Sequence, residues 1–295
     1  MSHLVSFADP AVLEAWACQI GFLTWAQSSP SPMLRLKKMG GLGYRGPGIL
    51  GFVSGEGHTN ERVAHLGRTL PDDYDSDPAR FAANQAANRL YSQRGDIHPA
   101  VAKRMAMEGC ALVLDVGGGN GVLARELAQY QVRPVTADRA VYVRDAPTPA
   151  LRSDALTLPF RDGTFSGAAM LWMLYHLPDP ASALAEVRRV LRPGGLLAVC
   201  APSRNNDPEL AGVLPHWGEA LSFDAENGPA TVASIFGAVE LETWDEPMVS
   251  VPDEGALALT LRGRGLEEHQ AQLASERLLT PMTLTKRGML AWARK

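Results

Sequence analysis

The sequence predicts an α/β fold in which a central parallel sheet is covered by helices on both faces. Three observations support this fold class. The 295 residues suit one α/β domain with appendages. From residue 111 onward, short apolar runs alternate with amphipathic helical segments, the pattern of a parallel sheet buried on both faces. A glycine-rich turn at 117–121 separates the first apolar run from the first helix, at the place where open α/β sheets bind their ligands.

Composition and charge exclude several classes of protein. The formal net charge is −4 and the Lys and Arg residues are scattered, so no basic surface for nucleic acid is expected. No apolar run reaches the length of a bilayer span, and the N-terminal segment makes a poor signal peptide, which favours a cytoplasmic protein without a membrane partner. The three cysteines lie too far apart in the sequence for a disulfide framework or a metal cluster. The aspartates of 72–75 lack the spacing and the further ligands of a metal loop, so no metal is predicted.

Residues 1–95 are expected to form a mostly helical and glycine-rich extension. The segment 8–27 has apolar residues at helical spacing, and Pro10 suits a first turn. The stretch 40–57 is rich in glycine without a repeat and predicts a mobile loop or a close-packed turn region. Two more helices are predicted over 77–93 and from residue 98 to 107. The extension is a candidate lid over the domain that follows it, 96–295.

The remaining elements follow in order along that domain. Buried strands are predicted at 111–116, at 132–137, in a short segment before Asp154, and at 166–174 and 196–202. Helices are predicted from about residue 120 to 130 and over 179–191, where "RPGG" ends the second one. The tail has a different pattern, because two strands, 238–251 and 287–295, flank two helices near 254–263 and 266–278.

Acidic residues around the glycine turn narrow the choice of ligand. Glycines 117, 119 and 121 let a ligand approach backbone N–H groups at the positive end of a helix. Asp138 ends the second strand, where a carboxylate can accept both ribose hydroxyls, so NAD and S-adenosylmethionine both fit. Asp115 would repel a pyrophosphate but can bond the amino-acid end of S-adenosylmethionine. Asp154 can accept from an adenine amine.

Five motifs in order, "VLDVGGGNG", "VTADR", "SDALTLPFRDGTF", "MLYHLPDP" and "EVRRVLRPGGLLAV", resemble the class I S-adenosylmethionine-dependent methyltransferases, in the small-molecule branch called type 11. The resemblance covers about 113–201. It implies a Rossmann-like seven-stranded sheet of order 3-2-1-4-5-7-6 whose last strand is antiparallel, with 254–278 as a helical insertion between strands six and seven. Ser166 replaces the family's usual Asp at a position expected to be structural. The prolines between 139 and 153 predict that the family's helix there is short or absent.

The resemblance also implies which residues contact the cofactor, S-adenosylmethionine. Gly117, Gly119 and Asn120 would face the methionine moiety, and Asp138, with Arg139 next to it, the ribose. Asp154, Ala155 and Leu156 would surround the adenine, and Leu171 and Trp172 would lie beside the sulfonium. From the N-terminal side, Tyr91 and Arg94 are candidates to close over the cofactor, with Arg94 near its carboxylate; a surface arginine is the alternative.

Candidate catalytic and acceptor-binding residues follow the carboxyl ends of strands four and five. His176 could act as a base or orient the acceptor, with Tyr175 as a weaker candidate, or it could simply pack at a helix entry. Arg204 and Asn205, in the loop after strand five, and His216 and Trp217 beyond it could line an acceptor pocket or form a partly buried helix face. Asp207 is expected to cap the helix that begins at Pro208.

Together these features predict methyl transfer from S-adenosylmethionine to a small organic acceptor, for which a bacterial secondary metabolite is one candidate. Two alternatives remain open. The protein could methylate RNA or protein, although its acidic balance argues against RNA, or it could bind S-adenosylmethionine without transferring a methyl group. The sequence leaves the oligomeric state undetermined, with a homodimer as one option.

Overall fold

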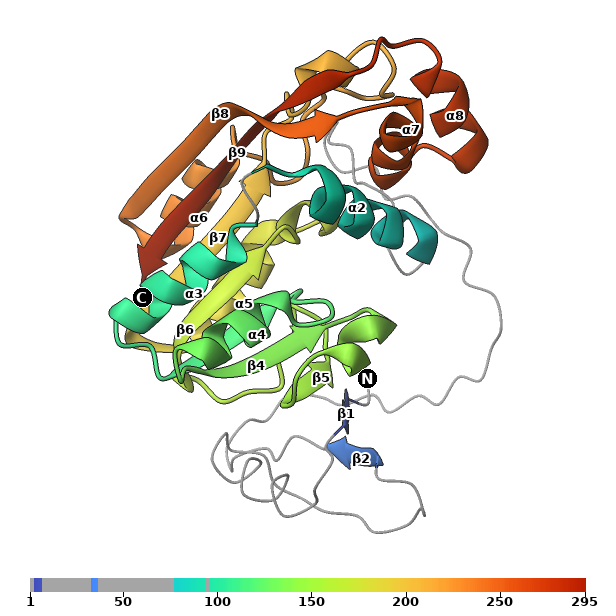
Figure 1. Cartoon of the computed structure of the whole chain (residues 1–295). Helices are drawn as coiled ribbons and strands as arrows, with labels where there is room; N and C mark the ends of the chain where they lie inside the picture. Colours follow the sequence, from blue (N-terminus) through green and yellow to red (C-terminus); the bar gives the residue numbers. More distant parts are fainter. Residues whose placement is uncertain (1–2, 7–32, 37–76, 94–95) are drawn as a thin grey trace, which may run out of the picture.

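The chain folds around a single twisted sheet (Figure 1). The computed structural model describes residues 3–6, 33–36, 77–93 and 96–295. Within them the strand order is β2-β1-β5-β4-β3-β6-β7-β9-β8. The strands are β1 (His3–Ser6), β2 (Met33–Leu36), β3 (Leu112–Val116), β4 (Arg133–Asp138), β5 (Ala150–Arg152), β6 (Phe165–Leu171), β7 (Leu191–Pro202), β8 (Val239–Val251) and β9 (Met282–Arg294).

The predicted seven-stranded core of this sheet is confirmed. Counted from β3, the order β5-β4-β3-β6-β7-β9-β8 is 3-2-1-4-5-7-6. The pairs among β5, β4, β3, β6 and β7 are parallel, and β9 runs antiparallel to both β7 and β8. Because β3 to β7 are parallel, their carboxyl ends meet at one edge of the sheet, which is where the glycine turn lies.

Helices cover both faces of the sheet. They are α2 (Pro78–Tyr91), α3 (His98–Met107), α4 (Val122–Gln129), α5 (Pro180–Val190), α6 (Gly228–Phe236), α7 (Glu254–Gly263) and α8 (Glu268–Ser275), with short 3-10 helices η1 (Val141–Asp145), η2 (Leu174–His176) and η3 (Pro208–Leu210). One apolar cluster joins the sheet to α5 and α6, and a second joins it to α3 and α4. A third cluster lies among α7, α8 and the far ends of β8 and β9.

Several details differ from the sequence prediction. Strands β1 and β2 pair with each other and extend the sheet beyond β5, and neither they nor α6 were predicted. The segment "RPGG" does not separate a helix from a strand, because β7 already begins at Leu191 and contains it. Helix α4 begins at Val122 rather than near residue 120, since the turn before it holds three left-handed glycines. The predicted helix 8–27 and the glycine-rich stretch 40–57 lie outside the described residues.

Ser166 ties the two central strands together, as expected of a structural position. Its hydroxyl accepts the N–H groups of Ala111 and Leu112, both at 2.9 Å, and donates to the carbonyl of Leu112 at 2.9 Å. This small network fixes the start of β3 against β6. The glycine turn at the other end of β3 is therefore carried on a strand whose register is firmly set.

Helix α2 is held to α7 by polar contacts and close backbone packing. Arg262 on α7 donates two hydrogen bonds to the carboxylate of Asp77, at 2.5 and 2.7 Å, and Asp77 also caps α2 by accepting from the N–H of Arg80. A Cβ atom on Gly263 would lie 2.8 Å from the Cα of Asn84, so only glycine permits this approach. Figure 1 shows α2 beyond the carboxyl ends of the parallel strands, on the side of α7.

Replacing Arg262 should loosen α2. The Arg262 side chain is 9% exposed. Removing it leaves the partly buried carboxylate of Asp77 without its cation. For Arg262→Ala we expect a loss of about 1–3 kcal/mol in the free energy of unfolding and faster hydrogen exchange in 78–91. The exposed Arg277 provides a matched control, because Arg277→Ala should change neither quantity. Equal effects of the two substitutions would show that the Asp77–Arg262 pair does not hold α2.

Candidate cofactor and acceptor site

The glycine turn after β3 has a backbone that only glycines adopt readily. Gly117, Gly119 and Gly121 have φ values of +71°, +54° and +80°, in the left-handed region. The N–H of Gly117 donates to the carbonyl of Ala137 on β4, and that of Gly121 to the carbonyl of Gly118. A Cβ on Gly119 would find only the ring of Phe81, at 3.8 Å, so the backbone at this position is open to a ligand.

Gly118 packs against the buried carboxylate of Asp115. A Cβ on Gly118 would overlap Oδ2 of Asp115 and lie 2.8 Å from the Cγ2 of Thr136. The sequence analysis singled out the glycines at 117, 119 and 121, but the tightest constraint in the turn falls on Gly118. The absence of a side chain there lets the backbone of the turn cross directly over Asp115.

Asp115 is a buried acid at the base of this turn. The residue is 2% exposed, and its Oδ2 atom has no hydrogen-bond partner within the described residues. Burial raises the pKa of Asp115 to about 7, an effect that His98 opposes and the negative charge of Asp138 strengthens. A buried polar atom without a partner is costly, so its presence beneath an open glycine turn is the local signature expected of a ligand site.

Asp138 connects the turn to the end of β4. Its Oδ2 accepts from the N–H of Gly119 at 2.8 Å, and its Oδ1 accepts from the N–H of Ala140 at 2.7 Å. A carboxylate has about four acceptor positions, so these two bonds leave capacity for the hydroxyls of a ribose. The neighbouring Arg139 is exposed, and its carbonyl accepts from Arg152.

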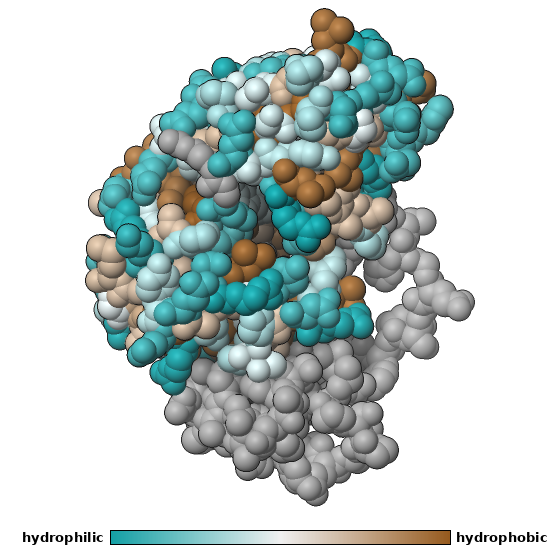
Figure 2. Space-filling model, in the orientation of Figure 1, coloured by the Kyte–Doolittle hydropathy of each residue, from teal (hydrophilic) through white to brown (hydrophobic). Residues whose placement is uncertain are grey.

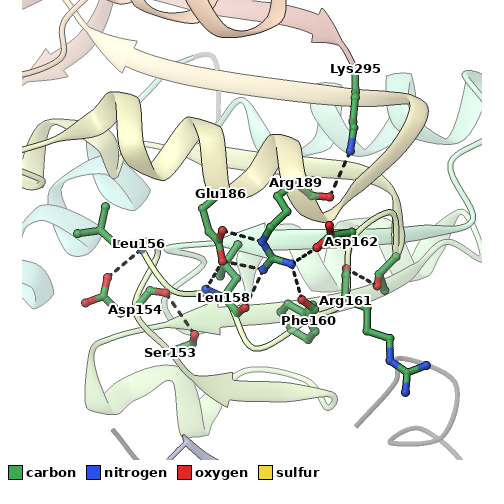
Figure 3. A network of polar contacts seen from close by, with 11 residues as sticks. Ser153, Asp154, Leu156, Leu158, Phe160, Arg161, Asp162, Glu186, Arg189 and Lys295 are labelled. Atoms are coloured by element: carbon green, nitrogen blue, oxygen red, sulfur yellow. Dashed lines mark hydrogen bonds and ion pairs between the residues drawn. The ribbon is translucent and has the colours of Figure 1, made fainter. Parts of the chain in front are cut away.

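The loop after β5 is fixed by an arginine on α5. Asp154 begins the loop, and its Oδ1 accepts a hydrogen bond from the N–H of Leu156. Ala155, between these two residues, is buried. Figure 3 shows Glu186 and Arg189 reaching this loop from α5. Glu186 accepts from the N–H of Leu158 at 2.9 Å, and Arg189 donates to the carbonyl of Leu158 at 3.0 Å.

Further bonds strengthen this attachment. Arg189 also donates to Glu186, to Asp162 and to the carbonyl of Phe160, and these carboxylates raise the pKa of its guanidinium beyond its ordinary value against the opposing effect of burial. The segment that carries Asp154, Ala155 and Leu156 is thus held in place without any ligand.

Two stacked aromatic rings, from η1 and α2, lie beside the glycine turn where the connection between β4 and β5 is short. As predicted, the segment between β4 and β5 contains only this five-residue 3-10 helix. Tyr142 of η1 stacks on Phe81 of α2 with ring centroids 4.6 Å apart and planes 6° apart. Phe81 is also the nearest side chain to the open face of Gly119. The sequence analysis missed Phe81, whose only signal was its place on the amphipathic helix before the domain.

The residues expected beside the sulfonium lie at the end of β6. Leu171 is 6% exposed, and Trp172 follows it with a φ of +58°, an uncommon conformation for a residue other than glycine. The indole of Trp172 meets that of Trp244 edge to face, at 6.2 Å between centroids. Met173, which the sequence analysis did not select, occupies the space that a Cβ on Gly117 would need.

His176 is a very weak base in this environment. Burial lowers its pKa to about 3, with smaller contributions from the positive charges of Arg80 and Arg139. Its ring lies 4.5 Å from that of Tyr175, centroid to centroid. At neutral pH the imidazole is uncharged, and its low pKa makes it poorly suited to accepting a proton from an acceptor.

The residues predicted to bind an acceptor already have protein partners. Arg204 pairs with both oxygens of Asp224, at 3.0 and 2.9 Å, and approaches Glu226. His216 is exposed and pairs with Glu219 at 3.0 Å. The remaining two are Trp217, whose indole N–H donates to the backbone carbonyl of Asn206, and Asn205, whose backbone carbonyl accepts from Arg287.

The predicted capping role of Asp207 is wrong. Its side chain makes no capping bond to η3; instead it pairs with Arg264 at 2.7 Å and Lys286 at 2.6 Å. Burial lowers the pKa of Lys286 to about 8, and the pair with Asp207 opposes that shift. The carboxylate is buried between these two cations, which come from β9 and the end of α7, and local sequence could not indicate this pairing.

The two residues proposed to close over the cofactor have different outcomes. Tyr91 is half-buried against the apolar cluster of α7 and α8. Arg94 lies outside the described residues. A recess in the surface lies between the part that carries α2 and α7 and the part that carries β4 and β5 (Figure 2). The polar residues around the glycine turn fit S-adenosylmethionine, since an open backbone, a buried acid without a partner and two acids at adjacent strand ends meet there.

No group of three or more His, Cys, Asp or Glu side chains in 77–93 and 96–295 is arranged to hold a metal ion. No helix in the same residues has the length and apolar character needed to cross a bilayer.

Comparison with known proteins identifies relatives among methyltransferases. Residues 114–199 match the model of a methyltransferase domain family. The demethylmenaquinone methyltransferase of Corynebacterium urealyticum is 32% identical over 169 residues, which are 52% of this chain and 67% of that protein. Its counterpart in Corynebacterium kroppenstedtii is 28% identical over 181 residues, 57% of this chain and 73% of that protein.

Solved structures share the fold at low sequence identity. The (4+2)-cyclase SpnF superposes with a TM-score of 0.52 at 18% identity, covering 78% of this chain and 99% of that one. The YcgJ protein of Bacillus subtilis gives a TM-score of 0.50 at 17% identity, over 66% and 98%. The fold and the sequence matches thus define a methyltransferase domain. The chain belongs to the class I S-adenosylmethionine-dependent methyltransferases, and S-adenosylmethionine is its cofactor.

A methyl group on Gly118 should disable the turn. In Gly118→Ala the new Cβ would displace the Asp115 carboxylate or the turn itself, and overpacking of this kind costs about 1–3 kcal/mol. We expect S-adenosylhomocysteine to bind roughly 10- to 100-fold more weakly by calorimetry. Gly212→Ala is a suitable control, because nothing lies within 4 Å of a Cβ there. Normal affinity in Gly118→Ala would contradict the close packing of the turn on Asp115.

Asp115 should also make the stability of the protein depend on pH. Its pKa of about 7 lies above the unfolded value of 3.8, so this group costs stability as pH rises through that interval. Between pH 5 and pH 8 the wild type should lose about 2–3 kcal/mol of unfolding free energy that Asp115→Asn does not lose. Urea denaturation of both proteins at the two pH values measures this difference. The same pH dependence in both would mean that Asp115 ionises as readily as an exposed acid.

Proposed function

We propose that this methyltransferase acts on a small organic molecule that enters through the recess between α2 and the carboxyl ends of the parallel strands. The observation that carries the proposal is the set of three acids at adjacent strand ends, Asp115, Asp138 and Asp154, around a glycine turn in which a Cβ on Gly119 would have only the ring of Phe81 within 4 Å. These groups account for the cofactor, whose sulfonium supplies an activated methyl group. The acceptor must then approach from the side that α2 partly covers.

The acceptor's class is supported less directly. The relatives from Corynebacterium carry the name demethylmenaquinone methyltransferase, which makes a demethylmenaquinone the first acceptor to test. Their likeness to this chain spans about half of it, so it supports the chemistry more strongly than the acceptor. A secondary metabolite, as predicted from the sequence, stays a prediction, and so do a cytoplasmic location and a lid role for residues 1–95.

His176 is proposed to orient the acceptor rather than to deprotonate it. Its pKa of about 3 leaves it neutral and a poor base at pH 7, yet it lies at the mouth of the sheet next to Tyr175. A neutral imidazole can donate one hydrogen bond and accept another, which is enough to hold a hydroxyl or carbonyl in line with the methyl group. An acceptor with an already electron-rich carbon or oxygen would need no base at this position.

The acceptor can be tested directly with the purified full-length chain and S-adenosylmethionine labelled on the methyl group. We expect label to appear in a small aromatic or quinol acceptor from a panel that includes demethylmenaquinol. An affinity for RNA that falls steeply with salt, together with labelled RNA, would instead favour the nucleic-acid alternative. Label in a protein fraction would favour a protein acceptor.

Substitution of His176 separates its two roles. If His176 orients the acceptor, His176→Ala should raise KM for the acceptor with a smaller change in kcat, and kcat should not rise with pH through a group near 6. A loss of about 10²–10⁴ in kcat with an unchanged KM would instead identify a general base. The affinity for S-adenosylhomocysteine, measured by calorimetry, should stay within twofold in either case and serves as the control for folding.

A further inference from the structure

His98 occupies a position at the site that the sequence analysis did not consider. It is the first residue of α3, a ten-residue helix that leads through a short connection into β3. Because α3 packs against β3 and the chain reverses between them, the start of the helix lies toward the carboxyl end of the strand, where the glycine turn follows. His98 and Asp115 are close enough that each alters the ionisation of the other.

The surroundings of His98 favour its charged form. Its Nδ1 pairs with Asp96 Oδ2 at 2.8 Å, and its side chain is 15% exposed. Burial opposes the charge, but the Asp96 pair and the carboxylates of Asp115 on β3 and Glu126 on α4 outweigh it, and the pKa of His98 is raised above its ordinary value. The amino end of α3 adds positive potential, which opposes the charge of the imidazolium but favours an anionic ligand group beside it.

A cation and an acid thus stand on two different elements beside the glycine turn. Asp115 has an oxygen without a hydrogen-bond partner among the described residues, beneath the glycine turn. The amino-acid end of S-adenosylmethionine carries one ammonium and one carboxylate, close together. The positive charge of His98 complements the ligand's carboxylate, and the negative charge of Asp115 complements its ammonium.

We propose that His98 binds the carboxylate of the methionine moiety while Asp115 receives its ammonium group, directly or through water. The proposal rests on the S-adenosylmethionine site assigned above. Asp96 then acts as a positioning residue that holds the ring by its Nδ1 and keeps it charged, leaving Nε2 for the ligand. Arg94, the residue to which the sequence analysis gave this role, lies outside the described residues.

Two ligands that differ only at the amino-acid end test this assignment. S-adenosylhomocysteine has the ammonium and the carboxylate, whereas 5′-methylthioadenosine keeps the adenosine and the sulfur without them. In His98→Ala we expect S-adenosylhomocysteine to bind about 10- to 100-fold more weakly and 5′-methylthioadenosine to bind within twofold of wild type. His269→Ala, at an exposed histidine on α8, is the matched control and should alter neither affinity.

The wild-type protein offers a second test that does not depend on the variant folding. The affinity for S-adenosylhomocysteine should fall as pH rises through the raised pKa of His98 and should also fall as pH drops below about 7, where Asp115 takes up a proton. The affinity for 5′-methylthioadenosine should stay flat over the same range, although Asp96, Glu126 and Asp138 also face these groups.

Other outcomes would overturn the proposal. Equal weakening of both ligands in His98→Ala would mean that His98 only maintains the shape of the turn, and no weakening of either would mean that it contacts no ligand. Parallel pH profiles for the two ligands would exclude a charged contact at the amino-acid end. If neither ligand bound the wild-type protein, the cofactor site itself, rather than the role of His98, would be refuted.

Discussion

The contact between the backbone at Gly118 and the buried carboxylate of Asp115 is the constraint on which the rest of the site depends. The carboxylate is almost fully enclosed, one of its oxygens lacks a partner in the described structure, and its pKa is raised to about 7. Such an arrangement is unfavourable for the protein alone, because burying a charge without full compensation costs several kcal/mol. It becomes reasonable when a cationic ligand group completes the site.

Two sets of polar contacts hold the surrounding segments in position. On one side, Glu186 and Arg189 fix both the N–H and the carbonyl of Leu158, and with them the loop that begins at Asp154. On the other, the pair between Asp77 and Arg262 and the close approach at Gly263 attach α2 to α7, so that Phe81 faces the turn. Binding groups held before the ligand arrives lose less entropy when it binds, which favours affinity and orientation.

The electrostatics of the acceptor side differ from those of the cofactor side. Acids lie at the ends of β3 and β4, whereas His176 experiences the positive charges of Arg80 and Arg139 and remains neutral. A site of this kind can place an acceptor against a sulfonium without removing a proton from it. The fold is shared with SpnF, which its name describes as a cyclase, so this fold supports more than one chemistry. The site, not the fold, must therefore identify the reaction.

The sequence by itself determined the succession of β3 to β9 along the chain and most of the helices between them, though not α6, β1 or β2. It also located the glycine turn and the acids at the ends of three strands, because each of these depends on local periodicity or on residues within one short segment. The shortened connection at η1 followed in the same way from its prolines. Only the tertiary structure decided which charges meet. Asp207 pairs with Arg264 and Lys286 from distant elements instead of capping its own helix, Arg204 is engaged by Asp224, and His98 comes to lie beside Asp115 although α3 precedes the strand. The physical reason is that pairing, burial and pKa depend on distances between segments far apart in the chain, and those distances are fixed by packing that no local pattern encodes.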